Sequence, residues 1–189
     1  MGRVILYEMR MSVDDQNLAL AAAGGDGKAF GVLLRRHYDR LFGLCFRLTG
    51  SKADAEDLTQ DICAALPAKL ASFKGDAKFT TWLYRVAVNA AHDRRRRQQT
   101  HARHADGWGD WEVNRQETIR EEAEARDWLS EAMTSLPQDL RDTLALTMDQ
   151  DMTQAQAADV LGVTEGTVSW RISEVKKRLK ALHEKETTL

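Results

Sequence analysis

Apolar side chains recur at helical spacing through most of this chain, and very little in the sequence interrupts them. From Phe30 to Leu48 they fall three or four positions apart over several turns, which is the spacing of one face of an α-helix. Only two prolines occur in 189 residues, Pro67 and Pro137. A β fold needs frequent turns built on proline and glycine. We therefore predict an all-α fold.

Composition excludes several classes of protein. A hydrophobic content of 43% is ordinary for a chain that folds around a core, and the length suffices for two small domains. The 27 basic and 29 acidic residues nearly cancel, so any charge that attracts nucleic acid must be local. Cys45 and Cys63 form no CxxC pair, which argues against a disulfide framework or a zinc finger. Because the longest apolar stretches, 4–7 and 18–23, are too short to span a bilayer, we predict a cytoplasmic protein.

Composition also divides the chain into four segments. Between residues 106 and 131, nine acidic residues stand against three arginines, a net charge of −6 that is typical of a linker. We predict an N-terminal extension over 1–16, a helical domain over 17–100, a flexible acidic linker over 101–127 and a second helical domain over 128–185. Within the first domain, Ser51 is predicted to cap a helix that Pro67 kinks or ends.

The second domain carries the pattern of a helix-turn-helix. Thr153 and Thr164 are each placed to cap a helix, and Gly162 between the two helices can adopt the left-handed turn conformation. From Arg171 to Lys180, five basic residues face only Glu174, a net charge of +4. A basic helix of this kind is typical of a helix that lies in the major groove of DNA. The alternative is a plain helical hairpin whose lysines are solvated.

A second basic stretch, 79–103, has a different character. Aromatic residues, an amide and a cation alternate over 79–89, and from residue 80 to 103 six arginines oppose Asp93 alone. Aromatic rings beside cations suit unpaired bases, because each base offers a face for stacking and a phosphate to neutralise. The alternative is that Trp82 and Tyr84 belong partly to the core and that the arginines form a solvated helix end.

Four motifs in order, 54–61, 79–89, Leu136-Pro137 and 166–171, resemble those of bacterial sigma factors, and specifically the small extracytoplasmic-function group. The resemblance covers about residues 18–182. It implies a transcription initiation factor that binds RNA polymerase core through the largest-subunit coiled coil and the flap, and that recognises promoter DNA. It also implies control by an anti-sigma factor, with no catalytic residue, metal or cofactor.

The resemblance also assigns roles to individual residues. Binding to core polymerase falls to an acidic helix with Asp54, Asp57, Gln60 and Asp61. Melting and holding the minus-ten element falls to Phe79, Trp82, Tyr84, Arg85, Asn89, Arg94 and Arg97. Reading the minus-thirty-five duplex falls to Thr164, Glu165, Thr167, Ser169, Trp170, Arg171, Lys176, Lys177 and Arg178. Gln154 or Gln156 stands where the family often has glutamate, which leaves the promoter preference open.

Two other classes of function compete with this interpretation. An enzyme would use the three aspartates of the acidic helix, or His101 and His104 with Asp106, as metal ligands, although ligands usually converge from separate elements. A helix-turn-helix regulator that acts without polymerase explains the second domain. It leaves the acidic helix and the aromatic, basic helix without a purpose.

Overall fold

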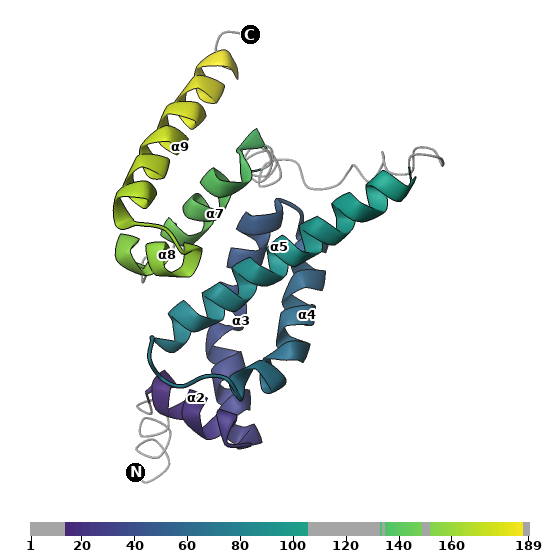
Figure 1. The fold of residues 1–189 in the computed structure, drawn as a ribbon, viewed down its shortest axis with the longest axis vertical. Coiled ribbons are helices and arrows are strands. Elements are labelled where there is room, and N and C mark those ends of the chain that lie inside the picture. Colours follow the sequence, from purple (N-terminus) through teal and green to yellow (C-terminus); the bar gives the residue numbers. More distant parts are fainter. Residues whose placement is uncertain (1–13, 106–132, 134, 149–151, 187–189) are drawn as a thin grey trace, which may run out of the picture.

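The computed structural model describes residues 14–105, 133, 135–148 and 152–186, and over these ranges it contains seven helices and no strand (Figure 1). The first four are α2 (Asp15–Ala23), α3 (Gly27–Thr49), α4 (Lys52–Leu70) and α5 (Phe79–Ala105). The others are α7 (Gln138–Thr147), α8 (Gln154–Leu161) and α9 (Glu165–Glu186). The predicted all-α fold is confirmed, and α2 begins inside the segment that the sequence assigns to an extension.

Local sequence explains where α3 and α4 begin and end. The Asp26 carboxylate accepts hydrogen bonds from the first-turn amides of α3, and Gly50 ends that helix with φ +73°. The Ser51 hydroxyl accepts from the Asp54 amide, as predicted, and so caps α4. The expectation for Pro67 was wrong in one respect, because α4 runs through it to Leu70. A proline at this point still costs one backbone hydrogen bond, and the burial of Leu66 and Leu70 on either side of it helps to offset that cost.

The first half of the molecule is built around α3, which packs against α2, α4 and α5. Its apolar face, which includes Leu33 and Leu44, meets Leu58 of α4 and Leu83 of α5 in a fully buried cluster. Burying one leucine contributes roughly 1.5–3 kcal/mol relative to leaving it exposed. This cluster therefore fixes the faces that α4 and α5 turn toward solvent.

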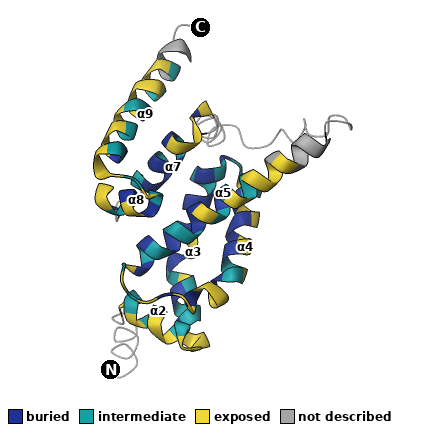
Figure 2. Ribbon diagram, in the orientation of Figure 1, coloured by how far each residue is buried: buried dark blue, intermediate teal, exposed yellow. Residues whose placement is uncertain are grey.

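The second half has helix-turn-helix geometry in α8 and α9. Thr153 and Gln156 form a reciprocal capping box at the start of α8, and Gly162 takes φ +66° in the turn, as predicted. Val168 of α9 is fully buried. Further along α9, Val175 packs with Leu136 and Leu140 beside α7. These contacts leave one face of α9 exposed (Figure 2).

The two halves pack directly on each other. Helix α7 lies against α3, and α8 lies against α5 (Figure 1). Leu146, Ala157 and Val168 of the second half belong to the same buried cluster as Leu44 and Leu83 of the first. The core is therefore continuous across the halves. The acidic linker from residue 106 onward lies outside the described residues. Among those that are described, no helix is long and apolar enough to cross a membrane.

Candidate nucleic-acid interface

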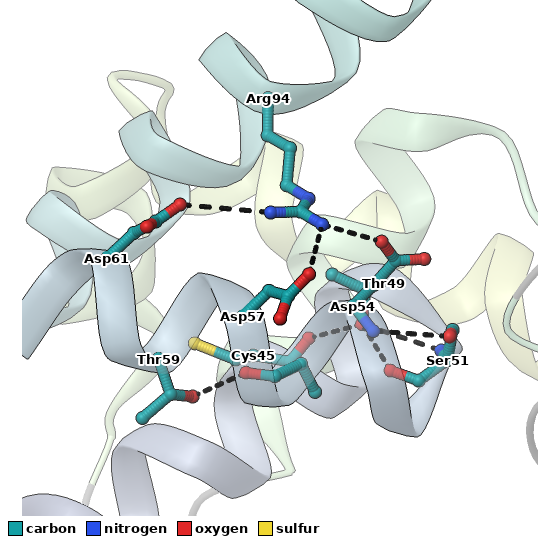
Figure 3. Close-up of polar contacts among 9 residues, drawn as sticks. Cys45, Thr49, Ser51, Asp54, Asp57, Thr59, Asp61 and Arg94 are labelled. Carbon is teal, nitrogen blue, oxygen red and sulfur yellow. Dashed lines mark hydrogen bonds and ion pairs between the residues drawn. The ribbon is translucent and has the colours of Figure 1, made fainter.

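One arginine meets all three aspartates on the outer face of α4 (Figure 3). Arg94 of α5 donates through Nη2 to Asp54 Oδ1 at 2.9 Å and to Asp57 Oδ2 at 3.1 Å. Its Nη1 lies 3.8 Å from Asp61 Oδ2. The spacing of these acids places them on one side of the helix, as predicted, and Gln60 is exposed beside them. We call Asp54, Asp57 and Asp61 the acidic stripe.

Arg94 is occupied within this structure, because it pairs with the acidic stripe. Its contact with the minus-ten element, which the resemblance assigns to it, stays a prediction. Partial burial lowers the pKa of Arg94, but the hydrogen bonds to Asp54 and Asp57 outweigh burial and hold that pKa above its ordinary value. The guanidinium stays charged and neutralises part of the stripe.

The aromatic residues at the start of α5 divide into two groups. Phe79 and Tyr84 are buried, with 4% and 2% of their surface exposed, so a contact of either ring with a DNA base would require it to leave the core. In this structure both rings belong to the core, and their contact with the minus-ten element stays a prediction. Trp82 is half-buried and packs edge-on against Phe73, with ring centroids 5.5 Å apart. Trp82 therefore lies at the surface of the aromatic group that it forms with Phe73 and Phe79.

The polar residues of α5 also differ in what they can reach. Asn89 and Arg97 are exposed. Arg85 instead turns toward the helix-turn-helix, where its Nη2 lies 2.7 Å from Asp159 Oδ2 and donates to the Asp159 carbonyl at 3.0 Å. In this arrangement Arg85 is occupied by α8 and not free for DNA.

The exposed face of α9 carries most of the predicted minus-thirty-five residues. Thr164, Glu165, Ser169, Trp170, Lys176, Lys177 and Arg178 are exposed, and Thr167 is half-buried. Trp170, with 62% of its surface exposed, is the largest side chain among them. Arg171 is the exception, because it points to α7, where its Nε lies 3.4 Å from Asp139 Oδ2. Its contact with the minus-thirty-five element stays a prediction, which requires Arg171 to leave Asp139.

A buried carboxylate joins the two halves, and sequence reasoning missed it. Asp142 of α7 has a side chain only 3% exposed; its Oδ2 lies 2.6 Å from His92 Nε2, and its Oδ1 accepts from Arg95 Nη2 at 3.0 Å. Nearby, Arg47 Nε donates to the Ala145 carbonyl at 2.8 Å. In the sequence, Asp142 looks like any polar residue between apolar positions of a helix. Only the packing of α7 on α5 distinguishes it.

The alternative metal sites find no support in the described part of the chain. No group of three or more His, Cys, Asp or Glu residues there could hold a metal ion. The acidic stripe faces Arg94 instead. Asp106 lies outside the described residues, and so do the side chains of His101 and His104.

Comparison with known proteins agrees with this geometry. Residues 33–101 match the family model "Sigma-70 region 2", and residues 126–179 match "Sigma-70, region 4". The ECF RNA polymerase sigma factor SigM of Mycobacterium tuberculosis is 33% identical over 168 residues, which cover 89% of this chain and 84% of that protein.

Two solved structures have a similar fold. The structure of CnrH in complex with the cytosolic domain of CnrY aligns with a TM-score of 0.66 and 28% identity, covering 90% of this chain and 97% of that one. The sigma factor RpoE from Bartonella quintana, in complex with the anti-sigma factor NepR, aligns with a TM-score of 0.70 at 24% identity, over 83% and 98%.

A helical protein with an exposed acidic helix, an aromatic and basic helix and a helix-turn-helix is built to join DNA to a protein partner. This chain belongs to the ECF RNA polymerase sigma factors. It directs promoter-specific initiation of transcription. The resemblance inferred from the sequence motifs is thereby confirmed.

Proposed function

We propose that this sigma factor divides its work between two units, 17–100 and 128–185. The first unit binds core polymerase and opens the minus-ten element, and the second reads the minus-thirty-five duplex. The proposal rests on two exposed faces of opposite charge, the acidic stripe on α4 and the basic face of α9. Segments 1–16 and 101–127 connect and flank these units.

The exposed residues supply the proposed contacts. Asp54, Asp57, Gln60 and Asp61 bind basic side chains of core polymerase, because charge complementarity steers and orients association. Trp82, Asn89 and Arg97 act on the minus-ten strand, where a ring can stack on an unpaired base. Trp170 and the residues at the start of α9 meet base edges, whereas Lys176, Lys177 and Arg178 neutralise phosphates.

The two units cannot contact their two promoter elements at the same time while they remain packed against each other. Two promoter elements about 25 base pairs apart are separated by roughly 85 Å along B-DNA, at about 3.4 Å per base pair. In the structure α5 and α8 touch through Arg85 and Asp159. The contacts of Asp142 with His92 and Arg95 and of Arg85 with Asp159 must therefore break when polymerase and promoter are bound. The packed form is the state of the free protein.

We further propose that this sigma factor has no catalytic activity of its own and acts in the cytoplasm, where polymerase and promoter are. An anti-sigma factor holds it inactive. The structures of similar fold support this part of the proposal, because CnrH is bound to the cytosolic domain of CnrY and RpoE to the anti-sigma factor NepR.

Run-off transcription with purified bacterial core polymerase and a genomic fragment library tests the function. Initiation that depends on this protein, at sites that share two spaced elements, is expected. A protein that binds DNA but forms no complex with core polymerase would support the stand-alone regulator instead.

Two tryptophan variants test the division of labour. Trp82→Ala is expected to impair promoter opening and leave binding to a minus-thirty-five duplex intact. Trp170→Ala is expected to weaken binding to that duplex and leave initiation on a pre-melted template intact. If both variants failed at the same step, the division would be wrong.

A further inference from the structure

The loop between α4 and α5 is held by a side chain from the first turn of α2. Gln16 Nε2 donates to the Gly75 carbonyl at 2.6 Å and to the Ala77 carbonyl at 3.1 Å, across 59 and 61 residues of sequence. A primary amide carries two N–H donors and can satisfy both carbonyls at once. One half-buried side chain therefore fixes two points of the loop over residues 71–78.

Gly75 gives the loop a tight turn where it meets α2. Gly75 has φ +83°, a conformation that residues other than glycine rarely adopt. A Cβ atom there would lie 3.4 Å from Gln16 Nε2 and 3.8 Å from Leu20 Cδ2. The loop backbone thus lies directly on α2. The tight turn at Gly75 and the hydrogen bonds of the Gln16 amide together hold this part of the loop in one conformation.

Helix α2 is itself anchored, so that Gln16 has a fixed base. The neighbouring Asp15 carboxylate accepts from Arg36 Nη1 at 2.7 Å and lies 2.8 Å from His37 Nε2. His37 is buried and meets the Phe79 ring edge-on, with centroids 5.1 Å apart. Phe79 is the first residue of α5. The contacts of Asp15, His37 and Phe79 thus fix both α2, which supports the loop, and α5, which follows it.

An open cleft of about 520 Å³ lies between the start of α2 and the loop. Asp14, Asp15 and Gln16 line one side of it, and residues 75–80 line the other. Since Gln16 bridges the two sides, its hydrogen bonds set the width of this cleft. Trp82 follows one turn into α5, beyond the cleft.

We propose that Gln16 is a positioning residue for minus-ten recognition, which holds the loop over 71–78, and with it the start of α5 that carries Trp82, in the shape that receives an unpaired promoter base. The inference rests on the proposed function of this unit. A loop ordered before binding loses less conformational entropy when the base enters, and its fixed shape favours the base that fits it over those that do not. Gln16 acts through the loop backbone and need not touch DNA.

A series of donor variants tests the inference in the full-length protein. Gln16→Glu keeps the shape but replaces the donor with a carboxylate facing two carbonyls, Gln16→Ala removes the group, and Gln16→Lys restores N–H donors. Asn17→Ala, one residue along on an exposed position, is the matched control.

The first readout is backbone nitrogen NMR relaxation of the free protein, and it does not depend on the function. The amide order parameters of residues 74–78 are expected to fall from about 0.85 in the wild type and Asn17→Ala to below about 0.6 in Gln16→Glu and Gln16→Ala. Gln16→Lys is expected to lie between them. Unchanged order parameters with retained helical content would overturn the inference.

The second readout is opening of four templates that differ only at the extruded minus-ten position, with core polymerase. Discrimination between the preferred base and the others is expected to fall about fivefold in Gln16→Glu, with core affinity and minus-thirty-five binding unchanged. Normal discrimination would overturn the inference while the proposed function stands. If the wild type opened no template, the proposed function itself would fail, and this inference with it.

Discussion

Arg94 and Asp57 form an ion pair at 3.1 Å between two helices whose predicted partners are different molecules. Asp57 belongs to the acidic stripe proposed to bind polymerase, and Arg94 belongs to the helix proposed to bind the minus-ten strand. Within the free protein, each of these two side chains is the ion-pair partner of the other. The incoming basic residues of polymerase must therefore compete with Arg94 for the stripe.

Replacing Arg94 is expected to strengthen binding to core polymerase. Exposed ion pairs contribute about 0.2–1 kcal/mol, so Arg94→Ala should tighten the core complex by a factor of about 1.4 to 5 at low salt. The salt dependence should steepen, because the unneutralised stripe carries more charge. Titration of labelled protein with core polymerase at several salt concentrations measures both effects.

Arg96 provides the control for this prediction. It lies two residues along on α5, is highly exposed and pairs only locally with Asp93. Arg96→Ala should leave core affinity unchanged. A loss of core affinity in Arg94→Ala would mean that Arg94 organises the stripe for polymerase and does not compete with it.

The buried carboxylate of Asp142 is expected to hold the halves together. Asp142→Ala leaves Arg95, which is mostly buried, without that partner; breaking buried pairs costs about 3–5 kcal/mol, and solvent access at His92 lowers our expectation to about 2 kcal/mol. Thermal unfolding should show the loss, and X-ray scattering should show a larger radius of gyration. Asp93→Ala, at an exposed acid on the same helix as Arg95, should change neither.

The sequence predicted local structure more successfully than side-chain partners. Helical periodicity, the Ser51 and Thr153 caps and the left-handed Gly162 depend on neighbours within a few residues, and the structure has all of them. Tyr84 and Arg171 carry the right chemistry for DNA, yet one is buried in the core and the other pairs with Asp139. Burial depends on which helices meet, and a single sequence does not state that.

Contacts between distant segments were the least accessible to sequence reasoning. Gln16 falls in a stretch predicted to be an extension, and its partners lie 59 and 61 residues away. Asp142 meets His92 and Arg95, which lie 50 and 47 residues away in the sequence. Neither residue has a local pattern that separates it from an ordinary solvated polar side chain.

Asp15 is expected to make stability depend on acid pH. Burial raises the pKa of Asp15, but hydrogen bonds from Arg36 and His37 outweigh it, so the pKa lies below its ordinary value of 3.8. A carboxylate with a lowered pKa stabilises the folded state above its unfolded pKa and loses this contribution as pH falls through the folded pKa. Asp15→Asn should therefore unfold at a lower temperature than the wild type at pH 7.

The difference between the two proteins should shrink as the pH falls below about 5 and vanish below the folded pKa. Because Asp15 is partly exposed, we expect at most about 1 kcal/mol at neutral pH. Thermal melts of both proteins from pH 7 to pH 2.5 measure it. A difference that stayed constant over this range would show that the ionisation of Asp15 contributes nothing.

Cys45 is expected to be unreactive until the protein unfolds. Burial raises the pKa of its thiol from 9.0 to about 11, against a smaller opposing effect of a hydrogen bond with Thr59. At pH 8 a shift of this size reduces the reactive thiolate about 100-fold, and burial also blocks access. In a Cys63→Ser background, which isolates Cys45, labelling by a thiol reagent at pH 8 should follow the opening rate of the α3 and α4 core. Complete labelling within the time that a free thiol needs would contradict the packing of Cys45 in that core.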